Sequence, residues 1–253
     1  NNILLLLDRC QEDEYNHLYS SPSINKIAYE CEFLSNLIII NSISKTRSLP
    51  GARIGYIVSD KPSISYVRFC NECTCYCPPS VFVIPFMMDL LCRSIHGINS
   101  QMIKRKIVAK FRREILKKAG FPFYQKYISS LLNFLEQSVT QLSADITERI
   151  RIIDDNYNLT KILLKDVIQD VTELNGGYNF CIKLRNTSCC NQIDFCSDVA
   201  NQTQVLLFPE SYFNNYKIDN HKNPFWIRLS VAREREEYKK MIMRFNVYCE
   251  QNI

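Results

Sequence analysis

Two unbroken aliphatic stretches stand out in the first part of the chain. Residues 3–7 read Ile-Leu-Leu-Leu-Leu and lead into Asp8, and residues 36–41 read Asn-Leu-Ile-Ile-Ile-Asn. Strands without polar alternation are typical of a parallel sheet that helices cover on both faces. The pattern therefore predicts two strands of an α/β domain, the second of which is central and buried on both faces.

A third strand is predicted after a Pro-Gly turn. Residues 53–60 read Arg-Ile-Gly-Tyr-Ile-Val-Ser-Asp, and the turn residues Pro50 and Gly51 precede them closely. Because the connection is short, we expect this strand to run antiparallel to its neighbour. Lys45 then lies just past the end of the central strand, and Arg53, at the start of the next strand, faces back toward it.

The later part of the chain is mostly helical in pattern. Apolar residues at i, i+3 and i+4 predict helices over residues 79–94, 104–118, 124–136 and 146–164. A shorter apolar stretch at residues 225–232 predicts a strand, which is interrupted by Arg228.

Lys45 and Arg53 have residue types and a spacing that suit one ligand. In open α/β sheets ligands gather at the carboxyl ends of strands, and a lysine held there among apolar neighbours has a lowered pKa and a nucleophilic amine. Such an amine forms a Schiff base with an aldehyde. A guanidinium together with the hydroxyls of Ser42 and Ser44 suits a phosphate dianion. Each residue alone would be interpreted as solvated surface, but the set predicts a site for an aldehyde that carries a phosphate.

The stretch from Ser42 to Tyr56 also resembles a known family. Its pattern, Ser-x-Ser-Lys-(x)4-Pro-Gly-x-Arg-x-Gly-Tyr, is similar to the lysine signature of the class I and II aminotransferases, which are pyridoxal-phosphate enzymes of fold type I related to aspartate aminotransferase. The resemblance implies that Lys45 forms a Schiff base with pyridoxal 5'-phosphate and that Ser42 and Arg53 hold the cofactor phosphate, with Ser44 beside them.

The resemblance also implies the fold and the domain organisation. We expect the carboxyl-terminal part of a large, mostly parallel α/β domain over residues 1–100 and a small α+β domain over residues 101–253. Residues 101–150 are interpreted as a helical insertion.

Asp8 and Gln11 extend the resemblance toward the start of the chain. In the family an aspartate at the end of such a strand pairs with the pyridinium nitrogen and keeps it protonated, which lets the ring accept electrons. Asp8 matches this position, and the alternative is a cap or turn residue after the strand. In the family a tyrosine three residues after this aspartate commonly donates a hydrogen bond to the phenolic oxygen of the cofactor. This chain has Gln11 at that position, whose amide could donate to the same oxygen. Tyr15 could also donate to it.

Arg228 extends the resemblance toward the other end. An Arg-x-x-x-Ala element at this place in the family supplies the arginine that binds the substrate α-carboxylate, and bidentate guanidinium contacts suit that group. The alternative is a surface charge on an edge strand. Weaker similarities lie in the Gly-Gly-aromatic strand at residues 175–182 and in residues 205–213, where Glu210 replaces the usual glycine.

Composition narrows the class of protein. The 253 residues are 46% hydrophobic and 23% charged, as in ordinary globular proteins. The formal charge of +5 is modest, so the basic stretch at residues 104–118 is interpreted as a solvated helix face rather than a nucleic-acid patch. No apolar stretch reaches the roughly 18 residues of a membrane span, and no charged region precedes the first one. We expect a cytoplasmic protein that binds neither membrane nor nucleic acid.

The chain has 12 cysteines, which we expect to be free thiols. Asn-x-Ser/Thr triplets at Asn158, Asn186 and Asn201 would be glycan acceptor sites if the chain were secreted. Four cysteines fall within residues 70–77 without a second, distant pair, so packing explains them better than zinc and no metal is predicted.

Segments that precede the first strand in the family are absent from this sequence, and the first 100 residues supply few strands for a sheet. We therefore expect the carboxyl-terminal portion of a longer protein or one half of a split one. The leading hypothesis is an aminotransferase that acts on an α-amino acid and a 2-oxo acid as a homodimer. Elimination, cyclisation or oxidation on the same scaffold is an alternative, and a non-catalytic or split-chain partner is another.

Overall fold

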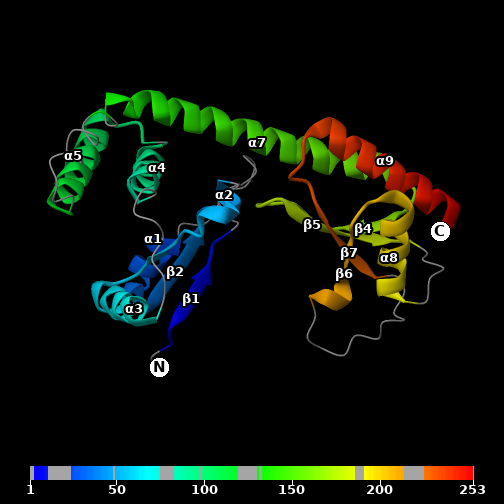
Figure 1. The fold of residues 1–253 in the computed structure, drawn as a ribbon, viewed down its shortest axis with the longest axis horizontal. Helices are drawn as coiled ribbons and strands as arrows, with labels where there is room; N and C mark the ends of the chain where they lie inside the picture. Colours follow the sequence, from blue (N-terminus) through cyan, green and yellow to red (C-terminus); the bar gives the residue numbers. More distant parts are fainter. Residues whose placement is uncertain are drawn as a thin grey trace. The chain divides into compact units, whose positions relative to one another are not determined.

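A computed structural model describes residues 3–10, 24–47, 49–74, 83–96, 98–118, 130, 133–185, 191–213 and 225–252 (Figure 1). Its contacts divide the described chain into two compact units, the first ending at Thr147 and the second running from Glu148. We describe each unit by itself. The division into functional domains near residue 100 stays a prediction.

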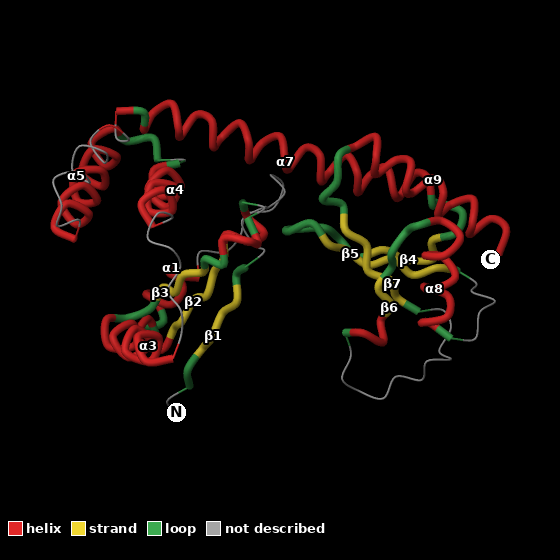
Figure 2. Tube along the Cα trace, in the orientation of Figure 1, coloured by secondary structure: helices red, strands yellow, loops and turns green. Residues whose placement is uncertain are grey.

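The first unit contains a three-stranded sheet in the order β1-β2-β3 (Figure 2). Strand β1 (Leu5–Asp8) pairs parallel with β2 (Leu37–Ser42), and β3 (Gly55–Val58) pairs antiparallel with β2. The predicted central strand, its parallel partner and the antiparallel third strand are therefore confirmed.

Burial of these strands differs from the prediction. In β2, Leu37, Ile39 and Asn41 are buried, whereas the residues between them are only partly covered. The buried face packs on Ala28 of helix α1 (Ile24–Glu30), but Leu6 of β1 is 59% exposed. The prediction that β2 is buried on both faces is therefore wrong for the described part of the chain. Helix α1 packs on one face, and the other face is covered less closely.

Further helices of the first unit are α3 (Lys61–Thr74), α4 (Val83–Ile95), α5 (Gln101–Lys118) and the start of α7 (Leu135–Leu163), which continues into the second unit. Some of these helices form a second core. Buried residues of α4 and α7 form this core, and the apolar face of α5 packs against it through Ile107, Val108 and Phe111. This confirms the predicted apolar face of the basic helix, and the prediction at 146–164 coincides with the second half of α7. Most of the predicted helix at 124–136 lies outside the described residues.

The second unit contains a four-stranded antiparallel sheet in the order β4-β5-β7-β6. Its strands are β4 (Ile168–Val171), β5 (Asn179–Leu184), β6 (Phe208–Pro209) and β7 (Trp226–Ser230). One face of β5 and β7 is buried against helices α8 (Gln192–Thr203) and α9 (Arg235–Asn252) and the second half of α7. The other face, which carries Arg228, is only partly covered.

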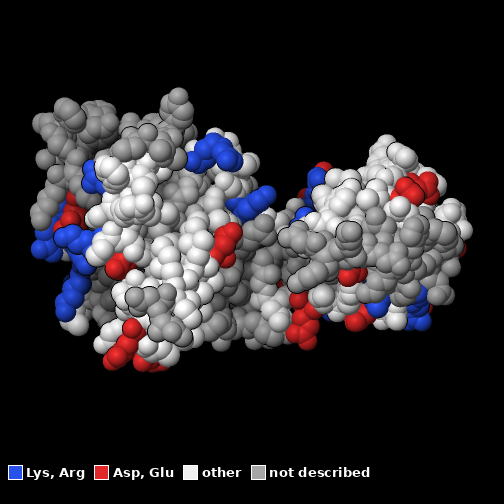
Figure 3. All heavy atoms as spheres, turned by 90° about the horizontal axis from the view of Figure 1, so that it is seen from below, with Lys and Arg blue, Asp and Glu red and all other residues white. Residues whose placement is uncertain are grey.

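Neither sign of charge dominates the described residues on the face of the molecule seen in Figure 3. Figure 3 shows basic and acidic side chains interspersed on the face in view. Within the described ranges, none of the helices has the length and apolar character needed to cross a bilayer.

Candidate functional site

Three strand ends in the first unit bring the predicted cofactor residues to one edge of the sheet. Asp8 ends β1 opposite Ile40, and the short helix α2 (Ile43–Thr46), which carries Lys45, begins directly after β2. Arg53 precedes β3, whose first residue Gly55 lies opposite the last residue of β2. Because β1 and β2 are parallel and β3 returns antiparallel, these residues lie at the same edge.

Ser42 fixes the start of α2 at this edge. Its Oγ accepts a hydrogen bond from the Ser44 backbone N–H at 3.1 Å, which is the usual contact of an N-cap serine. The same Oγ lies 3.0 Å from the Ser44 Oγ and 3.3 Å from the Ile54 carbonyl oxygen. Since Ile54 follows Arg53, these contacts join the helix of Lys45 to the segment of Arg53.

The side chains of Lys45 and Arg53 both face solvent. Among the described residues neither has a hydrogen-bond or ion-pair partner, so both cationic groups can accept an anionic or carbonyl ligand. The apolar surroundings predicted for the Lys45 amine are therefore not found in the described part of the chain. Arg53 has a φ of 50°, which is uncommon for a residue with a Cβ, and it ends the 3₁₀ turn η2 (Pro50–Ala52).

Asp8 accepts a hydrogen bond from the Cys10 backbone N–H at 2.9 Å. Hydrogen bonds from the Cys10 thiol and backbone hold the pKa of this carboxyl below its ordinary value. Burial, with a smaller effect of Asp8, raises the pKa of the Cys10 thiol to about 11. Asp8 is thus an ionised carboxylate in a local turn, as its alternative interpretation predicted, and it also lies at the shared edge. Gln11 lies outside the described residues.

An ion-pair cluster that no sequence pattern indicated lies beside α2. Arg47, which ends this helix, donates from Nε to the Asp89 Oδ1 at 2.8 Å, and its Nη2 makes an ionic contact with the same oxygen at 2.7 Å. Asp89 and Arg93 both lie on α4, four residues apart, and the Arg93 Nε donates to the Asp89 Oδ2 at 3.0 Å. The i, i+4 spacing of Asp89 and Arg93 was visible in the sequence, but the long-range partner was not.

Arg228 lies on the internal strand β7, between β5 and β6. Its interpretation as an edge-strand charge is therefore wrong. The guanidinium carbon lies 4.9 Å from the centre of the Phe208 ring and 4.4 Å from that of Phe213. Burial raises the pKa of the neighbouring Cys181 thiol, an effect that Arg228 partly opposes and Glu210 increases.

Glu210 stands where the family usually has glycine, and its carboxylate accepts a hydrogen bond from the Trp226 backbone N–H at 3.3 Å. Phe208 and Phe213 were not predicted as site residues, because only the strand register shows that Phe208 lies opposite Arg228.

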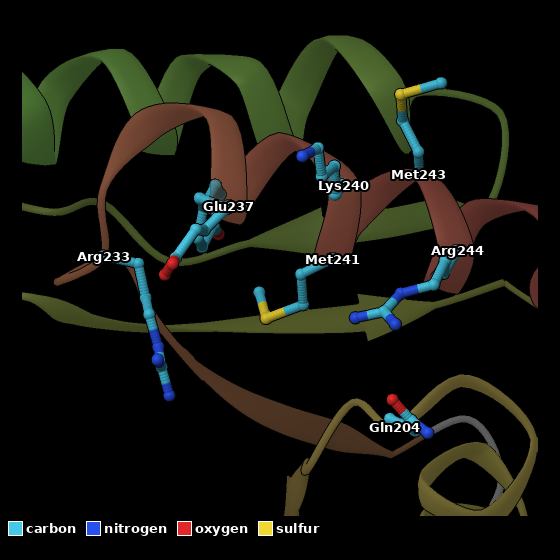
Figure 4. Close-up of a pocket in the computed structure, with 8 residues that line it drawn as sticks. Gln204, Arg233, Glu237, Lys240, Met241, Met243 and Arg244 are labelled. Carbon is cyan, nitrogen blue, oxygen red and sulfur yellow. The ribbon is translucent and has the colours of Figure 1, made fainter.

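A hollow of about 650 Å³ lies in the second unit, along helix α9 (Figure 4). It is lined by Gln204, Arg233, Glu237, Tyr238, Lys240, Met241, Met243 and Arg244. None of the predicted site residues lines it, so its volume does not identify the reactive site.

The described residues give limited information on whether the cysteines at residues 70–77 bind a metal. No three His, Cys, Asp or Glu side chains form a metal-binding group in the portion of the chain that the structure describes. Of the four cysteines at residues 70–77 only the side chain of Cys70 is described; it is half-buried and is a thiol rather than half of a disulfide.

Known structures share the fold of this chain. A PLP-dependent aminotransferase from Streptococcus suis has a TM-score of 0.58 and 16% identity, with 99% of this chain and 49% of that one covered. α-Aminoadipate aminotransferase from Thermus thermophilus, complexed with N-(5'-phosphopyridoxyl)-L-leucine, has a TM-score of 0.56 and 15% identity, with 98% of this chain and 50% of that one covered. Aspartate aminotransferase from Thermotoga maritima has a TM-score of 0.54 and 15% identity, with 98% of this chain and 56% of that one covered.

The chain thus spans about half the length of the solved structures it matches. This is consistent with the predicted partial α/β domain of fold type I. None of the curated proteins matches the chain. The family model described as aminotransferase class I and II matches residues 2–245, so the chain belongs to the class I and II aminotransferase family.

Proposed function

We propose that this chain is part of a pyridoxal-phosphate-dependent aminotransferase that transfers an amino group between an α-amino acid and a 2-oxo acid. The observation that carries the proposal is the common sheet edge at which Asp8, Ser42, Lys45 and Arg53 meet. Family membership supports it, and one neighbour carries a pyridoxyl derivative of leucine in its crystal structure.

The chemistry of these residues fits the cofactor. Pyridoxal phosphate presents an aldehyde, a phosphate and a basic ring nitrogen. The edge offers an amine and a guanidinium without partners among the described residues, the hydroxyls of Ser42 and Ser44, and an ionised carboxylate at Asp8. Each group of the cofactor therefore has a complementary side chain.

When bound, the cofactor supplies an aldehyde that condenses with amines and a ring that accepts electrons from the substrate. Lys45 would hold the aldehyde covalently. Arg53 and Ser42 would bind the phosphate by charge-assisted hydrogen bonds. The Asp8 carboxylate, whose lowered pKa keeps it ionised at neutral pH, would hold a proton on the ring nitrogen.

Two residues would act on the substrate itself. The Lys45 amine would be the base that accepts the proton of the substrate α-carbon and the acid that returns a proton during transfer of the amino group. Arg228 would bind the substrate α-carboxylate in a bidentate manner, which fixes the orientation of the α-carbon. We further propose a homodimer as the functional assembly, as the family resemblance implies.

The test uses the full-length protein incubated with pyridoxal phosphate. We expect a visible absorbance band that is lost in Lys45→Ala and kept in the control Lys61→Ala, which changes another exposed lysine of the same unit. After borohydride reduction, the cofactor mass should map to the peptide that contains Lys45. A cofactor adduct on a different lysine, or an unchanged band in Lys45→Ala, would refute the assignment.

A further inference from the structure

The guanidinium of Arg228 lies against two phenylalanine rings. Phe208 of β6 is the register partner of Arg228, and Phe213 follows the 3₁₀ turn η4 (Glu210–Tyr212). The guanidinium carbon is 4.9 Å and 4.4 Å from the two ring centres, within the distance at which a cation is attracted to an aromatic face. The ring centres are 6.5 Å apart and the ring planes make an angle of 61°, so the rings also contact each other edge to face.

These contacts leave the hydrogen-bonding groups of Arg228 available. Contacts of a cation with aromatic rings are electrostatic and form no conventional hydrogen bonds, so the N–H groups of the guanidinium can still donate to a ligand. The guanidinium of Arg228 donates to no protein group and forms no ion pair within the described ranges. Glu210, the acid near it, accepts a hydrogen bond from the Trp226 backbone instead.

Phe213 is 54% exposed, so its ring contacts Arg228 at the surface of the second unit. Its neighbour Tyr212 is equally open, at 59%, and has no ring or cation contact among the described residues. The two aromatic residues are thus matched in exposure and differ in their contact with Arg228.

We propose that Phe208 and Phe213 are positioning residues that hold the Arg228 guanidinium in one orientation for a planar carboxylate. The inference rests on the proposed function, since it deepens the role given to Arg228. A flexible arginine must be ordered when a carboxylate binds, and the rings order it beforehand. The chemical class of the ligand is a molecule with a carboxylate on the carbon that bears the amino or oxo group.

The first experiment measures carboxylate binding without turnover. The full-length protein is prepared without cofactor, and the dissociation constant of pyruvate is determined by NMR titration for the wild type and four variants. Phe208→Leu and Phe213→Leu should weaken pyruvate binding about 2- to 30-fold, which is the range of a lost cation–π contact. Phe213→Tyr, which keeps the ring, and Tyr212→Leu should bind as the wild type does.

The second experiment separates this inference from the proposed function. In the holoenzyme, Phe213→Leu should raise KM for the amino acid by a similar factor and change kcat less than about twofold, because a positioning residue acts through uniform binding. The cofactor absorbance band should be unchanged. Unaltered pyruvate affinity and unaltered KM in both leucine variants, with the band present, would overturn the inference alone. A wild-type protein that never acquires the band would overturn the proposed function and the inference with it.

Discussion

Asp89 is the residue whose replacement should most clearly expose how the lysine-bearing helix is held. Its two carboxylate oxygens accept hydrogen bonds from Arg47 of the α2 end and from Arg93 of α4. The three side chains are 25%, 18% and 20% exposed, so they are neither fully buried nor freely solvated. The change Asp89→Asn keeps the shape and removes the charge that both arginines share.

The expected cost follows from these contacts. A hydrogen bond to a charged group contributes about 1.5–3 kcal/mol when buried, and solvent screening at partial exposure reduces this. The variant loses the charge assistance of two such bonds and leaves Arg47 and Arg93 without the anion that separates them. We expect a loss of about 2 kcal/mol in the free energy of unfolding of the first unit.

Urea unfolding of the full-length protein, followed by circular dichroism, measures this loss. With an m-value of about 2 kcal/mol/M the unfolding midpoint should fall by about 1 M. The control Asp166→Asn removes a carboxylate of the second unit and should shift the midpoint by less than a quarter of that. An unchanged midpoint in Asp89→Asn would refute the idea that the ion-pair cluster anchors α2 on α4.

Two further predictions concern packing and protonation. Gly55→Ala should lower the free energy of unfolding by about 1–3 kcal/mol, because the new Cβ would lie 3.1 Å from the Asn41 carbonyl oxygen. Thermal denaturation measures this loss. The control Gly51→Ala, whose new Cβ would have nothing within 4 Å, should be neutral in the same assay. Tyr238 is buried beside Thr160, with 2.7 Å between the hydroxyl oxygens, and burial raises the pKa of this phenol from 10.0 to about 12. The unfolded chain therefore loses the phenol proton first, so stability due to Tyr238 is complete below pH 10 and is lost as the pH rises to about 12. Tyr238→Phe should show a smaller decline of the urea midpoint over this range than the wild type, and equal declines would contradict the assignment.

Local sequence signals were sufficient for the arrangement around Lys45. The aliphatic stretch of β2, the Pro-Gly turn and the alternating start of β3 are close in sequence, and their short connection determines an antiparallel pair. The cap that Ser42 forms on α2 was not predicted, although it is a contact with a residue only two positions away. Such features depend on neighbours along the chain, so they can be derived without knowing the rest of the fold.

Burial and long-range partners could not be derived in the same way. The aliphatic stretch of β1 predicted burial, yet Leu5 is 42% and Leu6 is 59% exposed among the described residues. The Arg47–Asp89 contact joins residues 42 positions apart, and the register of β6 on β7 brings Phe208 to Arg228. No periodicity or spacing carries this information, because it depends on which elements pack together.

A cationic side chain without a protein partner is stronger evidence for a ligand when it is partly buried than when it is exposed. Lys45 and Arg53 face solvent, and exposed cations commonly lack a protein partner, so their availability gains meaning only from the sheet edge they share. Arg228 is partly buried, where a cation without a counter-charge is costly. Its charge is offset by two aromatic rings, while the nearby Glu210 binds a backbone amide. An arginine kept among rings rather than paired with that carboxylate retains its N–H donors, which the proposed role of Arg228 in binding a carboxylate requires.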